Sequence, residues 1–193
     1  MKRYLYRLVT IIGFCSLPAC SFSIQPVVPV LAPASSNGAS LNCKALLLTP
    51  DEFLSREYVS SFEGREVRFM VGAPAAQAIE ALIRSRVAMV EKTSVTGDGT
   101  LEFIRLTQNH PSDPTLIIRP RFTRLESSVR PFRYNVEFGL AIDIAGVSSP
   151  ISPSGIGVGT AGMYAQSEIQ KAADAALSQA IKSIEVTFPS TCK

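Results

Sequence analysis

Residues 134–144 read Tyr-Asn-Val-Glu-Phe-Gly-Leu-Ala-Ile-Asp-Ile, and this stretch decides the fold class. A large apolar side chain stands at every second position, which is the pattern of a β-strand with one apolar face. The other face mixes small residues with Glu137 and Asp143, as is typical of a strand in a sheet covered on one side. The segment therefore predicts a long strand with one apolar face.

The neighbouring segments extend the sheet and add two helices. Further strands are predicted over residues 44–48, 65–71, 87–93, 101–107 and 115–125, with turns at 96–99 and 109–114. Helices are predicted from Pro74 to Ser85 and from Ser167 to about Phe188, where Ser167 and Gln170 match a capping box. Residues 146–162 read as a loop or a Gly-rich edge strand. The order predicts an α+β fold, with a mostly antiparallel or mixed sheet and two helices packed on one face.

The N-terminus has the features of an export signal. Lys2, Arg3 and Arg7 precede an apolar run over residues 8–15, which is too short to cross a bilayer. The sequence then reads Leu17-Pro18-Ala19-Cys20, which resembles the lipobox of bacterial lipoproteins. The alternative is an ordinary signal peptide with a cysteine near its cleavage site.

The lipobox resemblance implies that Cys20 carries the lipid anchor and becomes the first residue of the mature protein. Ser21 is not the Asp that favours inner-membrane retention in such lipoproteins, so we expect the outer membrane and its periplasmic face. Residues 1–19 are then the signal peptide. Residues 20–42 form a lipidated Cys and a Pro/Ser-rich tether, and residues 43–193 form one periplasmic domain.

Two cysteines remain after processing, Cys43 and Cys192. In an oxidising compartment we expect them to form a disulfide that joins the start of the domain to its end. Two free thiols or a metal-binding pair are the alternatives, and a metal site is disfavoured because no His lies near either cysteine. Without residues 1–19 the chain has 16 basic and 16 acidic residues, so the charge balance does not favour nucleic-acid binding.

Few residues of the sequence are candidates for catalysis, metal binding or nucleotide binding. His110 is the one histidine and lies in a Pro-rich turn, so the sequence lacks the His residues that most catalytic triads and zinc sites need. We therefore expect neither enzymatic activity nor a cofactor or metal. Residues 157–162 match G-x-G-x-x-G, but no hydrophobic strand precedes them, so nucleotide binding is disfavoured.

Five arginines gather within fifteen residues: Arg119, Arg121, Arg124, Arg130 and Arg133. They are either a solvated strand face whose charges prevent edge pairing or a binding surface for an anionic lipid, a saccharide or an acidic partner.

The whole arrangement resembles a group of small envelope lipoproteins that includes the YajG-like and LptE-like outer-membrane lipoproteins and, more remotely, the curli-secretion-like ones. The resemblance rests on residues 17–20, 71–72, 134–144, 155–162 and 172–184. It implies a non-enzymatic lipoprotein that supports an envelope assembly, in secretion, appendage formation or lipid transport, through contacts with another envelope protein. A binding module for an anionic lipid or saccharide is the alternative, and a homo-oligomer is also possible.

Overall fold

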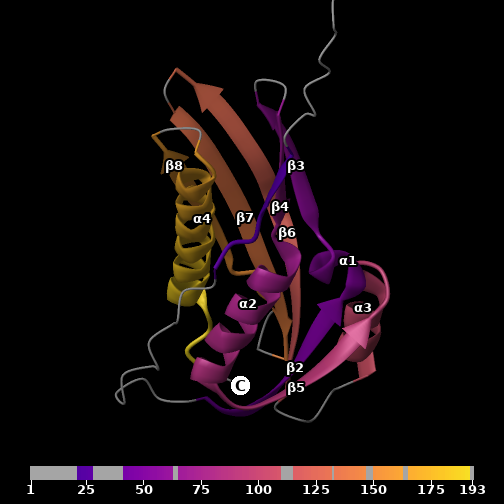
Figure 1. Cartoon of the computed structure of the whole chain (residues 1–193). Coiled ribbons are helices and arrows are strands. Elements are labelled where there is room, and N and C mark those ends of the chain that lie inside the picture. Colours follow the sequence, from indigo (N-terminus) through magenta and orange to yellow (C-terminus); the bar gives the residue numbers. More distant parts are fainter. Residues whose placement is uncertain are drawn as a thin grey trace, which may run out of the picture.

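The computed structural model describes residues 21–27, 41–62, 65–109, 115–131, 133–146, 150–162 and 165–191. They form a mixed α+β structure with two sheets (Figure 1). The large sheet has the order β5-β2-β6-β7-β8. Its strands are β2 (Leu41–Pro50), β5 (Val87–Val95), β6 (Thr115–Arg130), β7 (Arg133–Ala145) and β8 (Ser154–Ala161). β5 and β6 run parallel to β2, whereas β6, β7 and β8 are antiparallel, so the predicted fold class is confirmed.

A small sheet has the order β1-β4-β3 and consists of β1 (Phe22–Ile24), β3 (Glu57–Phe62) and β4 (Arg65–Met70). Its central aromatic residue, Phe69, packs against Tyr134 and Phe138 of β7. The small sheet therefore covers part of the same face of β7 that the alternating sequence makes apolar.

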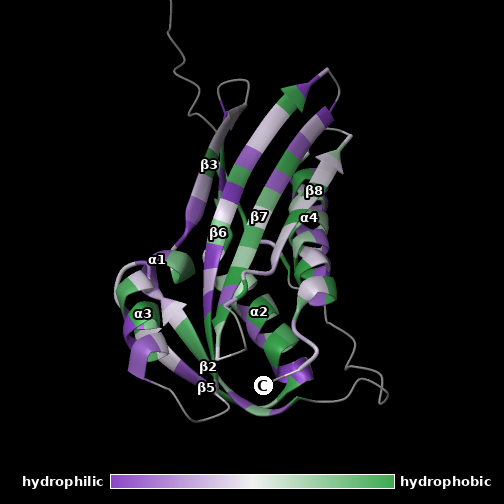
Figure 2. Cartoon of the chain, turned by 180° about the vertical axis from the view of Figure 1, so that it is seen from behind, coloured by the Kyte–Doolittle hydropathy of each residue, from purple (hydrophilic) through white to green (hydrophobic). Residues whose placement is uncertain are grey.

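Two long helices cover the rest of that face, as predicted (Figures 1 and 2). α2 (Gly72–Arg86) and α4 (Gln166–Thr187) each bury one stripe of apolar residues in the main core, and four of the eight buried residues of α4 are alanines. The apolar residues of β7 from Tyr134 to Ile144 are all buried in the same core. Among the described residues, no helix is long and apolar enough to span a bilayer.

Two shorter helices complete the fold, α1 (Asp51–Leu54) and α3 (Thr100–Asn109). The strand predicted over residues 101–107 is wrong, because this segment is α3. Asp98 accepts a hydrogen bond from the backbone N–H of Thr100 and so satisfies a free donor at the start of the helix. Phe103 and Leu106, three residues apart, then pack on a second cluster on the other face of the large sheet.

The structure corrects two further predictions. α4 begins at Gln166, with Ala165 as N-cap and no side-chain capping bond, so Ser167 and Gln170 form no capping box. Gln170 donates instead to the carbonyl oxygen of Gln25 and to Asp174. Residues 22–24, assigned to the tether, form β1 within the small sheet, and the domain therefore includes chain before residue 43.

Candidate functional site

The five arginines lie on β6 and at the start of β7. A β-bulge in β6 between Phe122 and Arg124 shifts the register by one residue. Arg119 and Arg121 before the bulge and Arg124 after it therefore point to the same face of the sheet, opposite α2 and α4. Sequence parity groups Arg119 with Arg121 but cannot add Arg124.

Asp143 of β7 binds the first two arginines. Its carboxylate accepts hydrogen bonds from Nη2 of Arg119 at 2.6 Å and from Nε of Arg121 at 3.2 Å, and a third from Oγ of Ser152 at 2.7 Å. Burial acts to raise the pKa of Asp143, but the hydrogen bonds from Ser152, Arg119 and Arg121 outweigh it and hold the pKa below its usual range. Asp143 is therefore an ionised, largely buried centre of this cluster.

Arg124 is paired as well, with Glu126 and Glu137 at 2.9 Å each. The three central arginines thus face three carboxylates, Asp143, Glu126 and Glu137, on the same sheet face. Arg130 and Arg133 stand opposite each other at the end of the β6–β7 hairpin, and both are exposed. The three central arginines are therefore paired with carboxylates, and the other two lie at the exposed tip of the hairpin.

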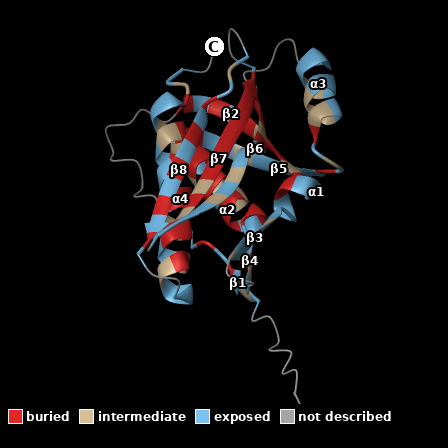
Figure 3. Cartoon of the chain, turned by 90° about the horizontal axis from the view of Figure 1, so that it is seen from above, coloured by how far each residue is buried: buried red, intermediate tan, exposed pale blue. Residues whose placement is uncertain are grey.

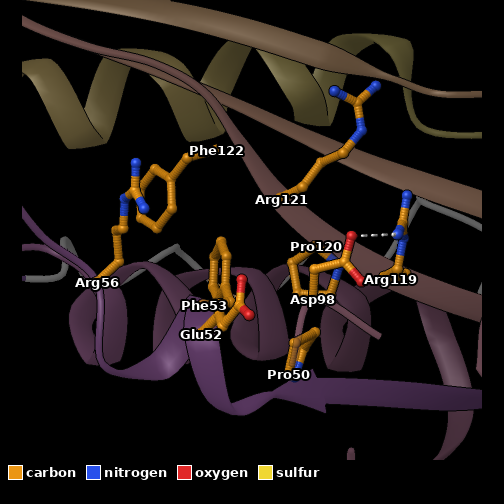
Figure 4. A pocket seen from close by; sticks show the side chains of 9 residues that line it. All are labelled: Pro50, Glu52, Phe53, Arg56, Asp98, Arg119, Pro120, Arg121 and Phe122. Atoms are coloured by element: carbon orange, nitrogen blue, oxygen red, sulfur yellow. Dashed lines mark ion pairs between the residues drawn. The ribbon is translucent and has the colours of Figure 1, made fainter. Parts of the chain in front are cut away.

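A pocket of about 270 Å³ opens between the end of β2, α1, the turn before α3 and β6 (Figure 4). Phe53 and Phe122 stack with their ring centroids 4.6 Å apart and supply its apolar wall. Acidic and basic side chains both line the pocket. The lining residues are Pro50, Glu52, Phe53, Arg56, Asp98, Arg119, Pro120, Arg121 and Phe122. An open pocket with aromatic walls and mixed charge can receive a polypeptide segment with side chains of both signs.

α3 follows the turn that carries Asp98, and it is the one helix of the described chain without a buried residue (Figure 3). Leu101 is 84% exposed and Ile104 is 46% exposed, one helical turn apart. Phe103, on the inner side, packs under the guanidinium of Arg119, whose carbon lies 5.6 Å from the ring centroid. Sequence reasoning missed this surface because it assigned the segment to a strand, although Phe103 and Leu106 have helical spacing.

The remaining residues singled out in the sequence have structural roles or lie outside the described chain. Residues 157–159 belong to β8 and pack directly on α4, so the G-x-G-x-x-G match is not a loop before a helix N-terminus. Cys43 is buried and disulfide-bonded, and its partner is not among the described residues. Cys20, His110 and Cys192 lie outside the described residues. Within the described ranges, no three His, Cys, Asp or Glu residues gather in a way that could hold a metal ion.

The comparisons with known proteins identify a solved structure of similar fold. No family model matches the chain, and no curated protein matches it. The chain is similar in structure to the protein XCC0632 from Xanthomonas campestris, whose crystal structure is described under the family model DUF330. The TM-score is 0.55 at 14% sequence identity, over 88% of this chain and 95% of that one. At this identity the likeness shows a shared α+β fold.

Proposed function

We propose that this chain is a non-enzymatic lipoprotein, anchored through Cys20 to the periplasmic face of the outer membrane, that supports an envelope assembly by binding another protein. Secretion, appendage formation and lipid transport are the classes of assembly that fit. The observation that supports the proposal best is the exposed apolar surface of α3, formed by Leu101 and Ile104.

An isolated helix of ten residues is marginal in water, and α3 buries no residue fully in its own domain. Its inner side uses Phe103 and Leu106, so Leu101 and Ile104 form a separate outer side. Two large apolar side chains one turn apart are the usual anchors of a helix in a partner groove. The neighbouring pocket adds Arg56 and Glu52 as polar contacts at the rim of such an interface.

Binding of an anionic lipid or saccharide along the whole Arg-rich strand has less support. The carboxylates of Asp143, Glu126 and Glu137 already occupy Arg119, Arg121 and Arg124. An incoming anion would have to displace them and leave carboxylates near its own charge.

The test is site-specific photo-crosslinking of the full lipoprotein in its native membrane, with the photoreactive residue at Leu101 or Ile104. Val186 on α4 is the matched control, because it is an apolar residue that is 85% exposed on another element. We expect one recurrent envelope protein from positions 101 and 104, and its loss in the Leu101→Ser/Ile104→Ser variant. Equal products from position 186, or lipid adducts alone, would count against the proposal.

Incorporation of labelled palmitate, compared between the native chain and Cys20→Ser, tests the anchor separately. Label that persists in the variant would show that Cys20 is not the acylated residue.

A further inference from the structure

The segment that follows Cys20 is bound to the domain. Phe22 of β1 stands opposite Val67 of β4, and Ile24 is fully buried in the main core. The carbonyl oxygen of Gln25 accepts a hydrogen bond from Nε2 of Gln170 at 2.7 Å. The backbone N–H of Val27 donates to Oδ1 of Asp174 at 2.8 Å. Residues 22–27 are thus held by β4 on one side and by α4 on the other.

Because β1 is part of the folded domain, the chain between the proposed lipid anchor and the domain is short. Only two peptide steps separate Cys20 from Phe22, and a fully extended chain covers at most about 7 Å over that length. A tether of more than twenty residues would let the domain move freely above the membrane. A link of two residues instead places the lipid beside the first residue of β1.

The strand directions show which end of the domain this is. β1 is parallel to β4, so Phe22 lies at the end where β4 begins and β3 finishes. Oγ of Ser127 in β6 is hydrogen-bonded to the hydroxyls of Tyr58 at 3.0 Å and Ser60 at 2.6 Å, which sets β6 beside β3. The β3–β4 and β6–β7 hairpins end together at the top of Figure 1.

Three arginines are exposed at that end. Arg65 begins β4, and Arg130 and Arg133 stand opposite each other at the tip of the β6–β7 hairpin, and all three are exposed. The nearest acid of β4, Glu66, is paired with Arg68 at 2.5 Å. Arginine binds phosphate oxygens bidentately, which makes such a tip complementary to a phospholipid surface.

We infer that this end of the domain lies against the bilayer that carries the anchor, with Arg65, Arg130 and Arg133 among the lipid phosphates. The inference rests on the lipid anchor proposed above. Arg130 lies eleven residue steps along β6 from Arg119, which is beside α3, and strand geometry gives about 35 Å for this length. The domain is then a spacer that holds α3 away from the membrane, toward a partner in the periplasm.

Orientation is tested on the processed lipoprotein in vesicles of phosphatidylcholine and phosphatidylglycerol with nitroxide-labelled headgroups. A fluorophore is attached to a cysteine placed at Val129, near the hairpin tip, or at Leu101 in α3; both side chains are exposed. We expect strong quenching at position 129 and little at position 101. Equal quenching at the two positions, or stronger quenching at position 101, would overturn the orientation.

The charge contribution is tested without the anchor, on the chain from Ser21, which keeps every residue that the structure describes. Arg130→Ala/Arg133→Ala should weaken binding to phosphatidylglycerol vesicles by about fivefold for each arginine, in a salt-sensitive manner. Arg84→Ala/Arg105→Ala, which removes two exposed arginines elsewhere, should leave the binding unchanged. Equal losses in the two variants, or no loss at the tip, would overturn the lipid contact. A failure of palmitate labelling would overturn the anchor alone, so the two proposals are separable.

Discussion

Gly157 in β8 and Ala176 in α4 approach so closely that a Cβ atom at position 157 would overlap the carbonyl oxygen of Ala176. Gly155 and Gly159 meet the backbone of Ala180 and Ala172 in the same way. The glycines of the strand and the alanines of the helix thus form one interlocked contact, which explains the Gly-rich run as a packing feature.

We therefore expect Gly157→Ala to lower the free energy of unfolding by about 1–3 kcal/mol or more, the usual range for overpacking a core. The strand and helix backbones would have to separate to admit the methyl group. Urea unfolding followed by circular dichroism measures this. Gly162→Ala is the control, because a Cβ there meets no atom within 4 Å. Equal effects of the two substitutions would contradict the packing argument.

Asp143→Asn should destabilise the domain at neutral pH, because it removes the ionised partner of Arg119, whose side chain is only 12% exposed. Losing one member of a buried pair costs about 3–5 kcal/mol, and the partial exposure of Arg121 favours the lower end. The exposed substitution Glu91→Gln should have little effect.

The loss of stability caused by Asp143→Asn should decrease as the pH falls. The pKa of Asp143 is lower in the folded chain than its ordinary value of 3.8, so its contribution is complete above that value. It is lost as the pH falls below 3.8 through the folded pKa. Denaturant unfolding of both proteins at pH 7 and below pH 3.8 should show the stability difference narrowing in acid. A constant difference would show that the Asp143 charge is not the cause.

Ile24→Ala should cost about 2–5 kcal/mol, as for other buried large-to-small changes, because β1 is part of the core. Val27→Ala is the matched control, since Val27 is 65% exposed on the same segment. Thermal and urea unfolding of the chain from Ser21 measures both. A null effect of Ile24→Ala would restore the assignment of residues 21–27 to a tether.

Cys43 is disulfide-bonded, and we predict Cys192 as its partner. The chain-entropy model gives a bridge that closes so long a loop a stabilisation of about 4–5 kcal/mol, as an upper estimate. Cys192→Ser and chemical reduction should therefore lower the urea midpoint to a similar extent. Mass spectrometry of non-reduced peptides identifies the pair directly, and a peptide joining Cys43 to another cysteine would refute the assignment.

Long periodic segments were predictable from the sequence. β7 carries a large apolar residue at every second position from Tyr134 to Ile144, α2 starts beside Pro74, and α4 carries an alanine stripe. The apolar residues of these patterns are buried as predicted. α3 was misread as a strand, although Phe103 and Leu106 have helical spacing. The hydrogen bond from the backbone N–H of Thr100 to Asp98 and the packing of Phe103 on the sheet decide for a helix.

Composition and periodicity are local properties, so the sequence alone predicted the fold class and the residues of the arginine cluster. The lipid anchor and the membrane address stay predictions. Tertiary structure alone decided that Phe22–Ile24 is a strand, since three residues are too few for a pattern and need β4 as partner. It also decided which carboxylates pair with Arg119, Arg121 and Arg124. The bulge at residue 123 and the β6–β7 register bring Arg119 and Arg121 to Asp143, and such pairing depends on residues more than twenty positions apart.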